Sequence, residues 1–107
     1  MALRASDFAP GSIVHDSADG VLAFAAAELR EHLTGAGAAG TVRISLATGT
    51  RATDGFVVTA APSAIVITGE SPRGTLNGEY WLLEKLGFAW VRPGQAGTRF
   101  VPGSSVA

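Results

Sequence analysis

The spacing of apolar residues predicts a first helix that begins near Asp16 or Ser17 and ends near residue 33. Within this segment the apolar side chains recur at intervals of three and four, which places them on one stripe of a helix. Arg30 and Glu31 lie off the stripe, and Gly35 is the expected C-terminal stop. The stripe consists of Leu22, Ala25, Ala26, Leu29 and Leu33.

A second helix is predicted over residues 72–86. Ser71 is a favourable N-cap, the first helical position holds a proline, and Gly87 can end the helix. Gly74 and Gly78 are four residues apart, so they share one side of the helix, where the backbone can approach a sheet closely. The expected apolar face comprises Leu76, Tyr80, Leu83 and Leu86.

Short runs of alternating or continuous apolar residues predict six strands around these helices. They are Ile13–Val14, Val42–Leu46, Phe56–Thr59, Ile65–Ile67, Phe88–Val91 and Thr98–Val101. The turn Ala61-Pro62-Ser63 makes the third and fourth runs a hairpin. The order β-α-β-β-β-α-β-β predicts an α+β fold in which each helix links parallel strands of a mixed sheet, with two helices packed on one face. The opposite face is expected to be bare or covered by another domain.

The length of 107 residues corresponds to one domain. We expect a leader over residues 1–11, a single domain over 12–102, and a linker or frayed tail over 103–107. A (β/α)₈ barrel needs at least about 200 residues and is excluded. The N-terminus carries no apolar stretch of the secretory type, and the compartment stays unknown.

The charge pattern argues against nucleic acid and membranes as partners. Charged residues make up 16% of the chain, below the average of about 25%, and the net charge is −1 with both signs scattered. The apolar runs are too short to span a bilayer. Cysteine is absent, which excludes disulfides and thiol nucleophiles.

Two motifs near the second helix imitate catalytic loops. The segment Gly69–Gly74 resembles a phosphate-binding loop, but Thr75 occupies the position where that loop needs lysine. Ser71 lies on a strand-to-helix turn as a hydrolase nucleophile does, but the closing glycine of that motif is missing. The start of a helix explains both segments.

The remaining polar residues form no clear catalytic set. His15 and His32 have no metal-ligand spacing. The four carboxylates considered for acid–base chemistry are Asp54, Glu70, Glu79 and Glu84, and for Glu79 and Glu84 we expect solvated positions on the helix surface. We therefore predict no catalytic residue, metal or cofactor in this chain. Tyr80, Trp81 and Trp90 form either a sugar-stacking platform or, more in keeping with small domains, core and domain contacts.

From Asp54 onward a set of short motifs resembles the N-terminal accessory domain of α-glucuronidases and related large glycoside hydrolases. That domain is similar to the second domain of β-N-acetylhexosaminidases (chitobiases). The resemblance covers about residues 12–102. Its motifs are Asp54-Gly55-Phe56, Ile65–Gly69, Ser71-Pro-Arg-Gly74, Asn77-Gly-Glu-Tyr80, Leu83-Glu84, Leu86–Trp90, Pro93-Gly94 and Val101-Pro102, together with Ala26-Ala-Glu-Leu29 in the first helix.

The resemblance implies a non-catalytic domain that packs against a following (β/α)₈ barrel, which carries the catalytic carboxylates. In such relatives the Arg-Gly helix start lies near the barrel, which makes Arg73 the leading contact residue; a local salt bridge to Glu70 is the alternative. Two positions depart from the family: Asn77 replaces a tyrosine, and Ala89 replaces a charged residue. The full set of candidate interface or sugar-contact residues is Arg73, Asn77, Tyr80, Trp81, Trp90 and Arg92.

The expected partner is therefore a catalytic barrel of the same polypeptide, and self-association of the isolated domain is a further expectation. A stand-alone carbohydrate-binding module that takes an oligo- or polysaccharide, and a small enzyme in its own right, are the alternatives. Fold by itself does not decide among them.

Overall fold

The computed structural model describes residues 3–15, 20–89, 99–100 and 105–106 of the chain. The elements in chain order are β1 (Leu3–Arg4), the 3₁₀ turn η1 (Ala5–Asp7), β2 (Phe8–His15), α1 (Gly20–Gly35), β3 (Val42–Thr48), β4 (Phe56–Ala61), β5 (Ala64–Gly69), α2 (Pro72–Lys85), β6 (Phe88–Ala89), β7 (Arg99–Phe100) and β8 (Ser105–Val106).

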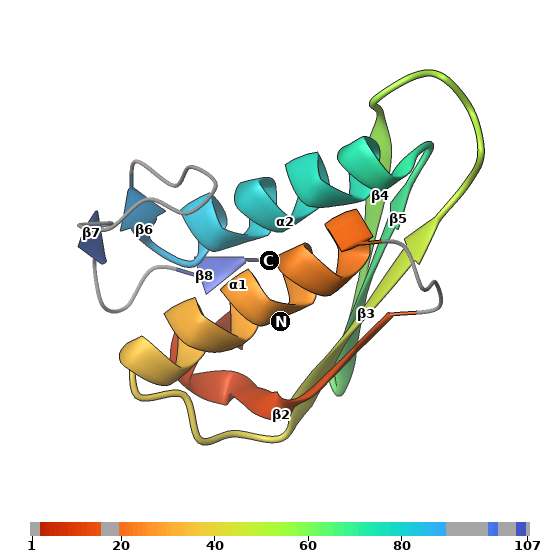
Figure 1. Ribbon diagram of the computed structural model, residues 1–107. Coiled ribbons are helices and arrows are strands. Elements are labelled where there is room, and N and C mark those ends of the chain that lie inside the picture. The colour runs from red at the N-terminus through yellow and green to blue at the C-terminus, as the bar shows by residue number, and fades with distance from the viewer. Residues whose placement is uncertain (1–2, 16–19, 90–98, 101–104, 107) are drawn as a thin grey trace.

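The main sheet has four strands in the order β2-β3-β5-β4. Strands β2, β3 and β5 run parallel, and β4 joins β5 as an antiparallel hairpin. Both helices lie side by side on one face of this sheet (Figure 1). This arrangement confirms the general prediction of an α+β fold with a mixed sheet and two helices. Neither described helix is long and apolar enough to cross a membrane.

The strand after α2 does not join the main sheet, and this part of the predicted topology is wrong. β6 pairs instead with β7 in a separate two-stranded sheet, Phe88 opposite Phe100. Phe88 is buried, and its ring meets the ring of His32 edge-on at 5.3 Å between centroids. Phe88 therefore closes the end of the helix layer, because it is buried there against His32 of α1.

The N-terminal residues belong to the fold, contrary to the predicted leader over 1–11. Leu3, Ala5 and Phe8 are buried, and β2 begins at Phe8, five residues before the expected strand. A register shift between Phe8 and Ile13 accommodates the proline and glycine between them. β1 pairs antiparallel with β8, so the described part of the predicted tail 103–107 is a strand. Phe8 pairs with Val42 in the sheet and is fully buried in the core cluster that the sheet shares with the helices.

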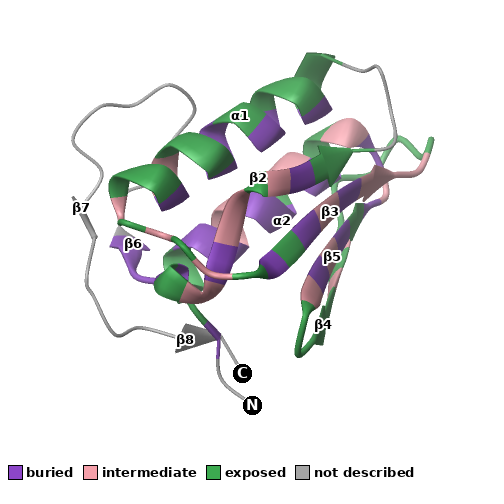
Figure 2. Ribbon diagram, turned by 90° about the horizontal axis from the view of Figure 1, so that it is seen from below, coloured by how far each residue is buried: buried purple, intermediate pink, exposed green. Residues whose placement is uncertain are grey.

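The core lies between the sheet and the two helices. All five residues of the predicted α1 stripe are buried, whereas Arg30 and Glu31 are exposed (Figure 2). The alternation in β3 is as predicted, with Ile44 facing the helices. The predicted helix stop is corrected: Gly35 is still helical, and the glycine with positive φ (78°) is Gly37. The predicted cap at residues 16–17 lies outside the described residues.

Helix α2 begins and ends where the sequence predicts. Ser71 is the N-cap, and Gly87 has φ 105° just beyond the C-cap. The predicted apolar face is confirmed for Leu83 and Leu86, which are fully buried, but the buried side is rotated toward the glycines. Leu76 and Tyr80 are only half-buried, whereas Gly74, Thr75, Gly78, Glu79, Leu82 and Leu83 are buried. The helix turns its glycine side toward the β4–β5 hairpin, because a bare backbone can lie closest to the strands.

Substitution of Gly78 tests whether α2 depends on this close approach to the sheet. A Cβ atom at this position would lie 2.5 Å from Cγ2 of Ile67 and 3.1 Å from Cδ2 of Phe56. Gly78→Ala should destabilise the fold by about 1–3 kcal/mol, because the overpacking outweighs the gain in helix propensity. Urea unfolding followed by circular dichroism measures the change.

Gly35→Ala is the matched control, since a Cβ at Gly35 meets nothing within 4 Å. It should leave stability unchanged or raise it by up to about 1 kcal/mol. A Gly78→Ala variant as stable as Gly35→Ala would show that α2 does not depend on this close contact.

Candidate functional site

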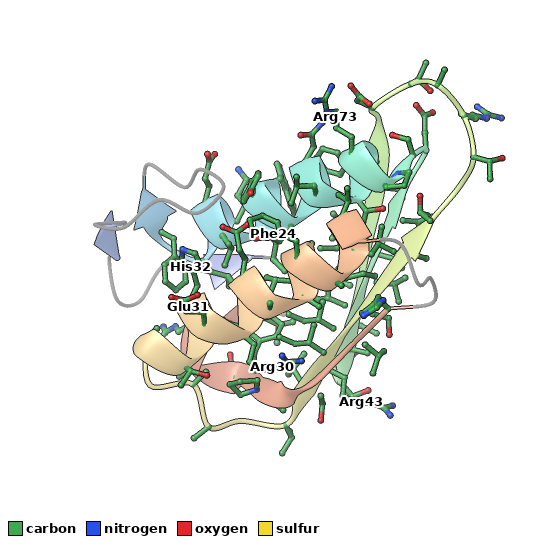
Figure 3. The ribbon with its side chains drawn as sticks, viewed as in Figure 1. Phe24, Arg30, Glu31, His32, Arg43 and Arg73 are labelled. Carbon is green, nitrogen blue, oxygen red and sulfur yellow. The ribbon has the colours of Figure 1, made fainter. Side chains whose placement is uncertain are left out.

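The candidate residues that the structure describes all lie on α2. Arg73, Asn77 and Trp81 follow one another at intervals of four, so they share the outward side of the helix. Arg73 points out from the first turn (Figure 3). Tyr80 lies on the flank that faces α1 and does not join this row. The last two candidates, Trp90 and Arg92, lie outside the described residues.

A network of hydrogen bonds ties the first turn of α2 to the loop before β4. The Ser71 hydroxyl accepts from the Gly74 amide (3.1 Å) and donates to Oδ1 of Asp54 (3.2 Å). The Asn77 side chain donates to the Asp54 carbonyl (3.3 Å). Asn77 therefore serves at least partly to hold the loop, and Ser71 acts as the predicted cap.

Two hydrogen bonds between Glu70 and Gly55 hold the end of the same loop next to β5. The Glu70 amide donates to the Gly55 carbonyl (2.8 Å), and the Gly55 amide donates to Oε1 of Glu70 (3.2 Å). A hydrogen bond from the side chain of Thr53, with further contributions from Gly55 and Arg51, lowers the pKa of Glu70 below its ordinary value. The ion pair of Glu70 is with Arg51 at 3.8 Å, not with Arg73 as the local alternative had it.

The two loop motifs have structural roles. The Thr75 hydroxyl is fully buried and donates to the Ala47 carbonyl in β3 (2.7 Å). A side chain at Gly69 would collide with the backbone of Thr75, so the turn between β5 and α2 is packed against itself. Because the Ser71 and Thr75 hydroxyls are both engaged within the fold, this turn serves as a helix start.

Trp81 is half-buried at the border between α2 and the sheet. Its ring lies 6.4 Å from the ring of Phe56, tilted by 53°. The Lys85 ammonium lies 5.7 Å from the centroid of the Trp81 ring, within the range of a cation–π contact. Trp81 thus packs against the core on one side and retains some exposed surface on the other.

Two glutamates meet in the interface between α1 and α2, and the sequence analysis did not anticipate this pair. Tyr80 donates from its hydroxyl to Oε1 of Glu28 (2.7 Å). Glu79 is fully buried, and neither of its carboxyl oxygens has a hydrogen-bond partner among the described residues. The predicted solvated position of Glu79 is therefore wrong, whereas Glu84 is exposed as expected.

Burial governs the protonation of Glu79. Burial, together with the nearby charge of Glu28, raises the pKa of Glu79 to about 9, so this side chain is a neutral acid at pH 7. Burial, the hydrogen bond to Glu28 and the charge of Glu79 also raise the pKa of Tyr80. The spacing in the sequence did carry a signal for the burial of Glu79. This residue lies four positions after Thr75 and three before Leu82, on the side of α2 that is buried.

The titratable side chains do not form a metal site in the part of the chain that is described. No group of three or more histidine, aspartate and glutamate side chains there could hold an ion. His15 is exposed at the end of β2, and Nδ1 of His32 lies 2.8 Å from the Glu28 carbonyl.

Comparisons with known proteins add no family assignment. No family model matches the sequence, and no curated protein has significant similarity to it.

Glu79 gives a prediction for stability against pH. Between about pH 4.5 and pH 9 the folded protein holds a proton on Glu79 that the unfolded chain has released, so the free energy of unfolding should fall as pH rises. At pH 7 the loss is about 3 kcal/mol relative to pH 4.5 or below. Glu79→Gln should remove this dependence and stabilise the protein at pH 8.

Urea unfolding midpoints at pH 5, 6.5 and 8 measure the effect. Glu79→Met serves as an apolar control of similar length, and Glu84→Gln serves as an exposed control that should keep the wild-type dependence. Equal pH dependence in the wild type and in Glu79→Gln would mean that Glu79 is not the group responsible.

Proposed function

We propose that this chain is a non-catalytic accessory domain of a larger glycoside hydrolase and that it buttresses a following catalytic (β/α)₈ barrel. The resemblance of residues 12–102 to the accessory domain of α-glucuronidases, and to the second domain of β-N-acetylhexosaminidases, motivates the proposal. An α+β sheet with two helices on one face is compatible with such a domain in its general class.

The observation that carries the proposal is the apolar surface left open on the outer side of the helix layer. Val21 and Phe24 of α1 are 38% and 40% exposed, and Tyr80 and Trp81 of α2 are only half-buried. Large apolar side chains left exposed on a helix layer are typical of an interaction surface. A domain packed over the helices would cover them.

Two polar residues on α2 fit the edge of such a contact. Arg73 is exposed at the first turn, where its guanidinium can donate several hydrogen bonds to carboxylates or carbonyls of a neighbouring domain. Asn77 is exposed one turn later, although one of its amide hydrogens already binds the Asp54 carbonyl. Polar residues around an apolar centre are the usual composition of a domain interface.

The buried carboxyl pair is unsuited to glycosidase chemistry. That chemistry needs two carboxyl groups on either side of a sugar, with room for the substrate between them. Glu79 is fully buried and Glu28 nearly so, in the interface of the two helices. The pair therefore does not favour the alternative of a small enzyme that uses these two carboxyl groups.

The size of the native polypeptide tests the proposal. An antibody raised against this chain, used on an immunoblot of the source cells, should detect a band several times larger than 10.9 kDa. The preimmune serum and an excess of purified chain as competitor are the controls. A single band near 10.9 kDa would contradict the proposal.

A stand-alone carbohydrate-binding module is the second candidate, favoured by the partly exposed Trp81 beside Arg73 and Asn77. Under the accessory-domain proposal, xylan- and chitin-derived oligosaccharides leave the tryptophan fluorescence of the isolated chain unchanged. A saturable shift that Trp81→Phe abolishes and Trp90→Phe retains would instead establish the binding module.

A further inference from the structure

The outer edge of β4 is an open strand edge with none of the usual protection against pairing. Natural edge strands carry charges, proline or a bulge that discourage contact with another strand. β4 has none of these. It reads Phe56, Val57, Val58, Thr59, Ala60, Ala61, and its pairing with β5 is continuous over all six residues.

The opposite edge of the sheet is protected. β2 contains Pro10 and Gly11, and its register shifts between Phe8 and Ile13. The four-stranded sheet therefore presents one blocked edge and one open edge, and no described strand pairs with the outer side of β4 (Figures 1 and 2).

The alternation of hydrogen-bonded pairs between β4 and β5 shows which backbone groups of β4 have no partner in β5. The Glu70 amide bonds the Gly55 carbonyl, so these two residues form a hydrogen-bonded pair of the antiparallel ladder. Such pairs alternate along the strands, so Val57 and Thr59 also direct their backbone groups toward β5. The N–H and C=O groups of the alternate residues point away from the sheet; these are Phe56, Val58 and Ala60.

We propose that a second copy of this chain pairs with this edge, β4 against β4, in an antiparallel arrangement with a two-fold axis at Val58. In this register Val58 lies opposite Val58 of the second copy, and Phe56 lies opposite Ala60. All three outward-facing residues of each strand then find partners, giving about six hydrogen bonds. The two sheets become one sheet with the helices of both copies on the same side.

The strand itself favours a second copy as the occupant. The edge carries no charge, so two identical edges meet without repulsion. The alternate residues Phe56, Val58 and Ala60 are symmetric about Val58, so the open groups are self-complementary. The protected edge at β2 prevents the dimer from growing into a longer sheet.

The contact is small, so the dimer is weak. Six residues span about 20 Å, and a band about 10 Å wide covers roughly 200 Å² of each copy. Stable complexes bury about 800 Å² per partner. We expect a dissociation constant on the order of 100 µM or weaker. This inference does not depend on the proposed function.

Disulfide trapping tests the register, because the chain has no cysteine of its own. Val57 and Thr59 face away from the helices and are exposed. In the proposed dimer Val57 lies opposite Thr59 of the second copy in a non-hydrogen-bonded pair, with Cα atoms about 4.5 Å apart. Such a pair can form a disulfide, whereas two Val57 positions lie beyond the limit of about 7 Å.

An equimolar mixture of Val57→Cys and Thr59→Cys, equilibrated in a glutathione buffer, should form several times more disulfide dimer than either variant alone. Equal yields in all three samples, or no dimer at 0.5 mM protein, would overturn the proposal. The second outcome would leave the edge to a strand from another protein.

The N–H and C=O groups of Ala60 are not needed for the pairing with β5, so a substitution at this residue separates folding from pairing with a second copy. Ala60→Pro removes an outward amide and should lower the yield of trapped dimer at least fivefold, with an unchanged circular dichroism spectrum. Ala60→Ser keeps the amide and should match the parent. If Ala60→Pro unfolds the chain, Ala60→Lys tests the same edge by placing a charge beside it. Undiminished trapping in the folded variant would contradict the proposal.

Discussion

The short distance between α2 and the β4–β5 hairpin is the constraint on which the rest of the fold depends. Gly78 lies against Ile67 and Phe56, and Gly74 lies against the carbonyl of Gly55. Side chains at these two positions would lift the helix from the sheet. Because the helix is held at these points, its rotation about its own axis is fixed. The same rotation directs Arg73 and Trp81 outward and Tyr80 toward α1.

The same rotation explains why an acid lies in the core. Once the glycine side faces the hairpin, Glu79 is carried into the interface with α1, where Glu28 is already engaged by Tyr80. A neutral carboxyl costs less to bury than a charged one, which is why the pKa of Glu79 rises to about 9. The helix pair is therefore held together by apolar contacts and by the hydrogen bond from Tyr80 to Glu28, whereas the carboxyl oxygens of Glu79 have no hydrogen-bond partner among the described residues.

Local sequence signals predicted those elements whose residues act within a few positions of one another. The α1 stripe, the Ser71 cap before a proline and the hairpin turn after β4 are all of this kind. The signals failed where a distant segment decides the outcome. Phe8 is buried because pairing with β3 places it in the core that the sheet shares with the helices, and the strand after α2 leaves the sheet because Phe88 is buried at the end of α1.

In the candidate site, too, local spacing could be predicted from the sequence, whereas the effect of distant segments could not. The outward row on α2 follows from helical spacing, so Arg73, Asn77 and Trp81 could be placed together from the sequence. The environment of Glu79 could not, since it depends on which side of α2 meets the sheet, and Leu76 and Tyr80 offered an equally apolar alternative. Glycines supply no hydrophobic signal, yet here they decide the orientation of the helix.

Trp81 connects the two surfaces that this orientation leaves open. Its ring packs on Phe56, whose backbone groups belong to the open edge of β4, while its remaining exposed surface belongs to the outer side of the helix layer. Val21 and Phe24 lie on α1, which packs over β2 at the opposite side of the sheet. A domain centred on α1 would therefore leave the β4 edge free, whereas one that extended over Trp81 would approach it. How far such a domain reaches along α2 decides whether pairing at β4 and the domain contact can coexist.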